Sequence, residues 1–431
     1  MSGRAPRVDR VRIPGGRALQ DPVLRILSFS TFVSTLGRGV FLAVTVLYFS
    51  LILGLSAIEV SIVYAVGAIV GAGGSALAGQ LSDVLSARRV HLVSMLLTGV
   101  ILAAYAFAAD FWSVLVIASI ESAAFGGLHS SQSAIIARAF DGPHRVQTRA
   151  ILRTVTNIGI AVGAGVAAIP LAIGTAGAFQ TVILVAAAMF ALSSLFLVRL
   201  PARVDAQSTD EEGNERKLTK AESRAHSPWR DPRYLAMTFL NGIFGIQFAL
   251  QEMGIPLWIA DHTVAPTATV SLLLVLNTLI VIALQVPLSK GTHELRRAGI
   301  VIAIAGGLMV VACVLYAGSG VAGVLLPFAI TLLVGGAIAG AFAEVLQQAG
   351  SWGLGFELAD PVRAGAYQGV FGMGFSVAGL VAPFIVTATV LTMGVPGWFV
   401  LAGIFVLAAA GMSAIAWTAK RSVTEPQEAV S

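Results

Sequence analysis

Four charged side chains stand inside long apolar stretches of this sequence. They are Arg38, Glu121, Glu252 and Glu344. A charge at the centre of a lipid bilayer costs about 2.5–3.5 kcal/mol on insertion scales, so such residues are rare and usually functional. We therefore expect these four residues to bind a substrate, carry a proton or pair with one another.

Arg38 and Glu121 lie at similar depths in the first and fourth apolar stretches. If they are in contact, each offsets much of the cost of burying the other, and loss of one would leave the other unpaired. We hypothesise an ion pair that a substrate or a proton can break. A static pair that only stabilises the fold is the alternative.

Glu252 differs from Glu121 because no basic residue lies within an apolar stretch of its own half of the chain. Burial favours the uncharged form of a carboxyl group, so Glu252 is our leading candidate for a proton carrier. A carboxylate in water at the rim of a cavity is the alternative. His129 could also titrate, although a hydrogen bond between helices is the simpler explanation.

Other polar and aromatic side chains share the apolar stretches with these charges. Glu344, with Gln347 and Gln348, predicts a polar patch near the cytoplasmic mouth of a cavity, either as a gate or substrate contact or as a solvated helix end. Asparagines in such stretches more often hydrogen-bond a neighbouring helix than a ligand. The candidates for a substrate cavity are Phe41, Phe125, Gln132, Asn157, Asn241, Phe248, Asn277 and Gln347.

The apolar stretches predict a membrane protein. Of the 431 residues, 57% are hydrophobic and 11% are charged, whereas about a quarter of a soluble protein is charged. Apolar runs of about 18 residues or more are typical of transmembrane helices. We expect twelve, at residues 23–53, 58–79, 90–109, 112–137, 150–172, 177–199, 234–259, 267–288, 297–317, 321–348, 361–390 and 395–419.

Basic residues mark one side of these segments. Apart from Arg38, the other 26 of the 27 Lys and Arg residues lie near the termini or on alternate connections, and the remaining connections hold neither. By the positive-inside rule, both termini are cytoplasmic in a multi-pass protein of the cell membrane. The net charge of +5 thus orients the chain in the lipid bilayer and does not indicate nucleic acid binding.

Residues 200–232 are hydrophilic, without apolar periodicity, and predict a flexible cytoplasmic linker. Equal lengths of chain precede and follow it. We expect residues 1–199 to form a six-helix bundle with a basic cytoplasmic N-terminus. Residues 233–431 would form a second six-helix bundle with a short cytoplasmic tail, as an internal repeat.

A short polar motif joins the second and third segments. It has the pattern G-x-L-x-D from Gly79 to Asp83, followed by the basic pair Arg88 and Arg89. Gly79 would end the second helix in a tight turn. Asp83 needs hydrogen-bond donors, which the two arginines or the N-terminus of the helix after Asp360 could supply.

The motif resembles the loop between helices 2 and 3 of the major facilitator superfamily of membrane transporters. The resemblance implies an all-α fold of twelve transmembrane helices in two pseudo-symmetric six-helix bundles, which work by alternating access. It implies that Gly79, Asp83, Arg88 and Arg89 form a conformational latch between the bundles. Helices 1, 4, 7 and 10 line the cavity in this family, and all four buried charges fall on them.

Two further motifs of the family, an arginine in helix 4 and a Gly-Pro pair in helix 5, are missing here. The resemblance to bacterial multidrug or metabolite efflux carriers implies proton-coupled export of a small lipophilic or cationic compound, by a monomer. Proton-coupled import of a small metabolite is the first alternative. A membrane sensor or scaffold that transports nothing is the second.

Catalytic chemistry has no sequence support. The chain has no G-x-x-x-x-G-K-[ST] loop for ATP, no nucleophile–base set and no metal-ligand spacing, and Cys313 is its single cysteine. We therefore expect no enzymatic activity, no cofactor and no metal.

Overall fold

The structure is a computed structural model that describes residues 21–168, 173, 175–205, 220–321 and 323–419. These residues form helices joined by short connections, and none of them lies in a strand. The first half contains α1 (Pro22–Leu47), α2 (Ala57–Leu81), α3 (Ala87–Ala104), α4 (Phe111–Ala139), α5 (Gly142–Val166) and α7 (Ala176–Leu197).

The second half begins with a segmented helix. Its parts are α9 (Pro232–Phe244), α10 (Ile246–Ala249), a π-helical turn at Leu250–Gly254, and α11 (Ile255–His262). The helices that follow are α12 (Thr269–Leu288), α13 (Leu295–Ser319), α14 (Leu326–Glu357), α15 (Ala364–Val386) and α16 (Val395–Thr418).

Each of the twelve predicted segments contains a helix. Ten helical stretches of the described residues are long and apolar enough to cross a membrane, and one of them, Ile58–Phe107, contains both α2 and α3. The helix α5 is not among the ten. It is the more polar because it begins at Gly142 rather than at residue 150 as predicted, which adds Arg145 and Arg149 to the helix and places Arg153 11 residues from its start.

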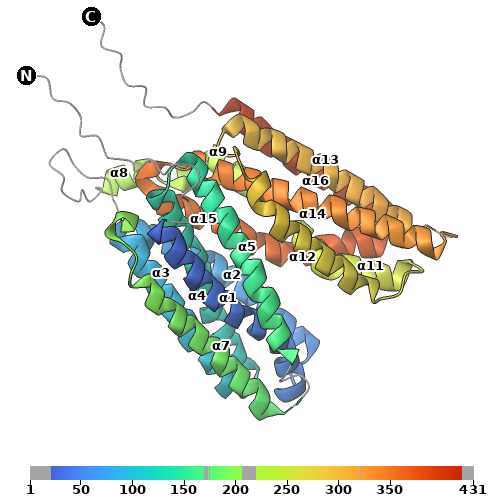
Figure 1. Cartoon of the computed structure of the whole chain (residues 1–431), viewed down its shortest axis with the longest axis horizontal. Coiled ribbons are helices and arrows are strands. Elements are labelled where there is room, and N and C mark those ends of the chain that lie inside the picture. The colour runs from blue at the N-terminus through green and yellow to red at the C-terminus, as the bar shows by residue number, and fades with distance from the viewer. Residues whose placement is uncertain (1–20, 169–172, 174, 206–219, 322, 420–431) are drawn as a thin grey trace, which may run out of the picture.

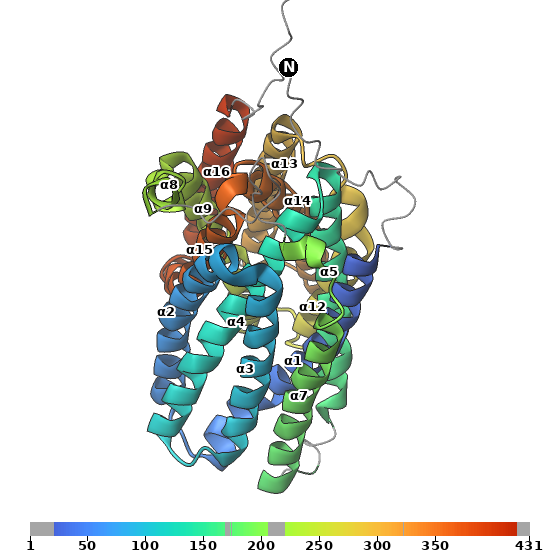
Figure 2. The same cartoon turned by 90° about the vertical axis from the view of Figure 1, so that its left-hand side faces the viewer.

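The helices form two bundles, α1 to α7 and α9 to α16, which meet at one end and diverge toward the other (Figure 1). We call the shared end the linker face and the opposite end the far face. The described connections at the linker face are residues 82–86, 140–141, 198–205, 220–231, 289–294 and 358–363. Figure 2 shows α2, α3 and α4 running away from the linker face side by side.

Side-chain caps start several helices at the far face. Ser56 and Asp110 form capping boxes at the beginnings of α2 and α4, and Thr175 caps α7. Such caps satisfy backbone N–H groups that have no partner within the helix. Hydrogen bonds from the side chain and backbone of Ser113 also lower the pKa of the Asp110 carboxyl group.

The bundles touch closely where α2 crosses α15. The prediction that Gly79 ends the second helix is wrong, because α2 continues to Leu81. A Cβ atom at Gly79 would collide with the backbone of Gly365 and Gly369. Gly79 is therefore needed for close packing of the two helices, and the Ser75 hydroxyl adds a hydrogen bond to the Gly369 carbonyl at 3.0 Å.

The predicted linker is partly folded. It contains a 3₁₀ turn at Ala202–Asp205, the short helix α8 (Lys220–Ala225) and a second 3₁₀ turn at Pro228–Arg230. Asp205 pairs with Arg88 at 3.3 Å, which ties the start of the linker to α3. The middle of the linker, the predicted basic N-terminus and the predicted C-terminal tail lie outside the described residues.

Candidate functional site

Arg38 of α1 and Glu121 of α4 contact each other inside the first bundle, as predicted. The distance from Arg38 Nη1 to Glu121 Oε1 is 2.5 Å, and the side chain of Glu121 is 8% exposed. The guanidinium group also lies 4.1 Å from the ring centre of Phe125 and 5.8 Å from that of Phe41. Two of the predicted cavity aromatics therefore cover this ion pair.

A second arginine–glutamate pair joins the two bundles. Arg153 Nη2 of α5 lies 3.2 Å from Glu344 Oε1 of α14, whose side chain is only 3% exposed. The other carboxylate oxygen, Glu344 Oε2, accepts hydrogen bonds from Gln251 at 3.2 Å and Asn277 at 3.3 Å. The ring centre of Phe248 lies 5.7 Å from the Arg153 guanidinium.

This second pair corrects two predictions. Glu344 lies 13 residues before the end of the 32-residue helix α14, about 20 Å from the linker face at 1.5 Å per residue, and so is not at a cavity mouth. The buried charges are also not confined to the first, fourth, seventh and tenth helices, because Arg153 belongs to α5. The run Asp141-Gly142-Pro143 before the apolar stretch was the available signal, since Asp followed by Pro is typical of a helix start.

A chain of buried amides continues from Glu344 along α14. Gln347 donates to the Asn241 side-chain oxygen at 2.7 Å and accepts from Gln247 at 3.3 Å. Asn241 Nδ2 and Gln247 Oε1 have no hydrogen-bond partner among the described residues. Unmatched amide groups of this kind are suited to hydrogen-bond a water molecule or a polar ligand.

Gln132 belongs to the first bundle. It donates to the Thr31 hydroxyl at 3.1 Å, and its side-chain oxygen accepts from Arg149 at 3.3 Å. Gln132 therefore connects α4 with both α1 and α5, on the linker-face side of the Arg38–Glu121 pair.

Three predicted residues stand apart from these contacts. Within the described part of the chain, the side chains of Glu252, His129 and Asn157 make no hydrogen bond or ion pair. Glu252 is exposed in the π-helical turn, near enough to Arg153 and Glu344 to interact with their charges. The predicted hydrogen bond of His129 to another helix is wrong, because its imidazole packs edge-on against Phe125 at 4.6 Å between ring centres.

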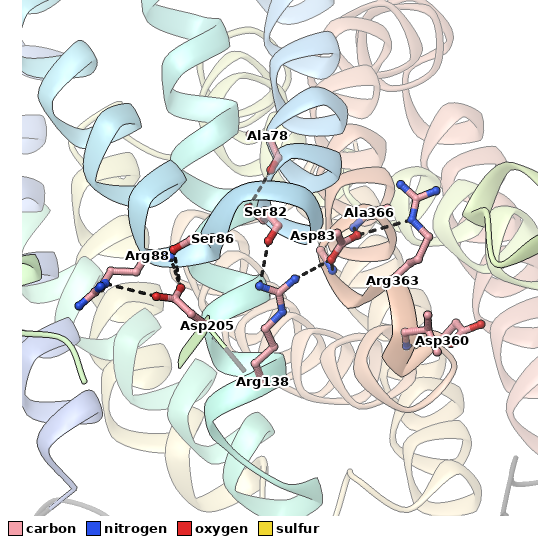
Figure 3. A network of polar contacts seen from close by, with 12 residues as sticks. Ala78, Ser82, Asp83, Ser86, Arg88, Arg138, Asp205, Asp360, Arg363 and Ala366 are labelled. Atoms are coloured by element: carbon pink, nitrogen blue, oxygen red, sulfur yellow. Dashed lines mark hydrogen bonds and ion pairs between the residues drawn. The ribbon is translucent and has the colours of Figure 1, made fainter. Parts of the chain in front are cut away.

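Asp83 is held by the N-terminus of α15, as one of the predicted alternatives proposed. It accepts the backbone N–H groups of Gly365 at 2.7 Å and Ala366 at 2.8 Å. Arg138 of α4 donates to it at 2.7 Å (Figure 3). Asp360 caps the short 3₁₀ turn before α15 through the N–H of Val362 at 2.9 Å.

The predicted role of Arg88 and Arg89 as partners of Asp83 is wrong. Residues Ser82–Ser86 form a π-helical turn, which separates the two arginines from Asp83. Arg88 binds Asp205 and the carbonyl of Leu200 instead, on the other side of the turn (Figure 3), and Arg89 is exposed. Arg138, which replaces them, is far away in the sequence and carries no local signal.

Two bundles of long apolar helices have the architecture of a polytopic membrane protein. No group of described residues could hold a metal ion. The family model of the Major Facilitator Superfamily matches residues 27–383. The chain therefore belongs to the major facilitator superfamily, whose fold supports secondary transport.

Solved structures with the same fold include transporters of several kinds. The human organic anion transporter MFSD10 (TETRAN) is 15% identical, with a TM-score of 0.69 over 93% of this chain and 100% of that one. FucP in its outward conformation is 15% identical, with a TM-score of 0.71 over 93% and 99% of the two chains. The proton:xylose symporter XylE is 13% identical, with a TM-score of 0.66 over 93% and 96%. No curated protein is similar enough in sequence to match this chain.

Proposed function

We propose that this protein is a proton-coupled secondary active transporter that works as a monomer by alternating access. The observation that carries the proposal is the Arg153–Glu344 pair. It crosses from one bundle to the other at 3.2 Å, with the carboxylate almost fully buried. A group that can bind a proton at this place can link protonation to the separation of the bundles.

Protonation of Glu344 would remove the charge that Arg153 pairs with. Arg153 is partly removed from water, and an arginine in this position is destabilised when it loses its carboxylate, which weakens the contact between the bundles. Gln251 and Asn277 would also lose the negative acceptor of their hydrogen bonds. The bundles would then separate at the linker face once Asp83 also leaves the N-terminus of α15.

The proposed orientation places the linker face in the cytoplasm. The described connections at that face carry basic residues, among them Arg199, Arg203, Lys290 and Arg363, and the far-face connections carry neither Lys nor Arg. This asymmetry is the one expected of cytoplasmic loops. In this orientation the protein is closed toward the cytoplasm and its bundles diverge toward the outside.

Two directions of transport follow from two different observations. The resemblance to efflux carriers favours export of a small lipophilic or cationic compound, with Glu252 as the free carboxylate that a cation would meet. The site geometry favours uptake, because protonation of Glu344 would release Arg153 for a second ligand. Proton and substrate would then bind together and move in the same direction.

Flux in proteoliposomes tests the coupling. The protein would be reconstituted with a pH-sensitive dye inside, and fluorescein and rhodamine 123 would be supplied as anionic and cationic probes under an imposed pH gradient. We expect probe flux and proton movement in the same vesicles, with both lost in Glu344→Gln. The matched control is Glu294→Gln, at an exposed carboxylate of the linker face. Undiminished proton movement in Glu344→Gln would contradict the proposal.

A further inference from the structure

Two arginines of α5 face the second bundle one helical turn apart. Arg149 and Arg153 are four residues apart in the sequence, so their side chains are neighbours on one helix face. Arg153 is paired with Glu344. Arg149 has no carboxylate within 4.0 Å among the described residues, and its recorded partners are the neutral side chains of Gln132 and Trp352.

The positive charge at this place is incompletely matched. A cation removed from water is costly unless an anion or several hydrogen bonds compensate it. Within the described parts of the chain, Arg149 has one hydrogen bond, of 3.3 Å to Gln132 Oε1. Arg153 Nε is buried without a hydrogen-bond partner among the described residues. Like charges one turn apart on a helix also repel each other.

Nearby carboxylates do not remove the mismatch. Glu121 is committed to Arg38, and Glu344 to Arg153. Glu252 is near enough to interact with the charge of Arg153, but it forms no ion pair with either arginine of α5. Among the described residues, the Arg149 guanidinium group thus faces the bundle interface with most of its N–H donors lacking a hydrogen-bond acceptor.

Aromatic rings from the second bundle face both arginines. The ring centre of Trp352 lies 5.8 Å from the Arg149 guanidinium, and that of Phe248 lies 5.7 Å from Arg153. Cationic donors therefore belong to one bundle and apolar rings to the other. A ligand with an anionic group and an apolar body would contact both bundles at once, and the planar guanidinium of Arg149 matches a carboxylate, sulfonate or phosphate.

We infer that the transported compound is an organic anion whose acidic group binds Arg149 and Arg153 at the bundle interface. This inference rests on the proposed function and names the charge of its substrate. It replaces the lipophilic or cationic compound that the sequence suggested, because two of the three carboxylates expected to attract a cation are already paired with arginine.

Probes that differ mainly in charge test the inference. The full-length protein in detergent would be titrated with 2-naphthoate, 2-naphthalenesulfonate and 2-naphthyl phosphate, with neutral 2-naphthamide and with cationic 2-naphthylmethylammonium. Thermal unfolding and calorimetry would report binding. We expect at least one of the anions to bind and to raise the unfolding midpoint, and the neutral and cationic probes to have no effect.

Variants of Arg149 locate the site. Arg149→Gln should weaken binding of the anion at least tenfold, and Arg149→Lys should weaken it several-fold, because a lysine keeps the charge but loses the planar fork. Arg296→Gln, at an exposed arginine near the linker-face end of α13, should bind as the wild type does. The inference is overturned if no anion binds, if the cation binds as well as the anions, or if Arg149→Gln leaves anion binding unchanged.

Flux measurements separate this inference from the proposed function. If an anion binds through Arg149 but is not moved across proteoliposome membranes, the site stands and the transport proposal fails. If rhodamine 123 is moved by a pH gradient and Arg149→Gln does not alter its flux, transport stands and the anion site fails.

Discussion

Among the residues that the structure describes, two arginine–glutamate pairs have a buried carboxylate, and they differ in what they join. Arg38–Glu121 links α1 to α4 within one bundle, and Arg153–Glu344 links α5 to α14 across the interface. The first lies about 24–27 Å from the linker face along its helices and the second about 16–20 Å. Glu121 has Arg38 as its recorded hydrogen-bond donor, whereas Glu344 has three donors from three helices.

The difference suggests different tasks. A pair within one bundle moves as a unit when the bundles rock, so it contributes to the stability of that bundle throughout the cycle. A pair between bundles must break or rearrange in every cycle, because its two sides separate. Asp83 also lies at the interface, but it accepts backbone N–H groups, which can leave only if the start of α15 itself moves.

The largest expected effect is on stability, from the pair inside the bundle. Glu121→Gln should leave Arg38 buried without its counter-ion and destabilise the protein by about 3–5 kcal/mol. The double variant Arg38→Gln with Glu121→Gln should recover part of this loss. Chemical unfolding of the wild type, the two single variants and the double variant measures these free energies of unfolding. Additive losses in the double variant would show that the two residues do not act as a pair.

The next effect is on transport, from the pair between the bundles. Arg153→Gln should reduce proton-driven flux about a hundredfold, which corresponds to about 2.7 kcal/mol, because Glu344 would remain buried without its cation. The amount of folded protein should fall less than in Glu121→Gln, because Gln251 and Asn277 still donate hydrogen bonds to the Glu344 carboxylate. Flux in proteoliposomes measures this, and a loss that follows the amount of folded protein would make this pair structural, like the first.

A smaller effect is expected at the linker face. Asp83→Asn should reduce flux about tenfold, because an amide cannot replace the charge that Arg138 and the start of α15 contact. Insertion into the membrane should be normal. Transport measured at matched protein levels checks the prediction, and full activity would remove Asp83 from the conformational cycle.

The smallest effect is expected at Glu252. Its exposed carboxylate forms no ion pair among the described residues, so Glu252→Gln should alter the pH dependence of flux by a few-fold and leave stability unchanged. The pH profile of transport measures this. If Glu252→Gln abolished the proton dependence of flux, Glu252 would be the proton carrier, as the sequence alone predicted.

The sequence predicted the helices and the Arg38–Glu121 pair, because both follow from the hydropathy of the chain. Hydropathy locates apolar helices, and two opposite charges at equal depth are costly unless they meet. The same property hid the role of Arg153, because apolarity began the fifth segment at residue 150 and so placed Arg153 at its very end, beside the basic connection, instead of 11 residues into α5. The Asp141-Gly142-Pro143 start would have placed Arg149 within the helix and Arg153 well away from its end.

The partners of Asp83 show a different limit. The contact of Asp83 with the N-terminus of α15 could be predicted, because Asp83 is negatively charged and Asp360 marks the start of a helix. The choice of Arg138 rather than Arg88 as the partner of Asp83 could not be predicted. It depends on the π-helical turn at Ser82–Ser86, which directs Arg88 away from Asp83. Nothing in the residue pattern distinguishes such a turn from an ordinary loop. Gly79 was likewise assigned to a turn, although its need for space comes from a helix almost 300 residues away.

The central claim is that protonation of Glu344 controls the separation of the bundles at the linker face. Spin labels at Arg89→Cys and Arg296→Cys, two exposed positions on different bundles, would report that separation in a Cys313→Ala background. The account predicts that the distance between the labels increases as the pH falls in the wild type, and that Glu344→Gln shows the long distance at every pH. A Glu344→Gln protein that follows the wild-type distances at each pH would contradict it.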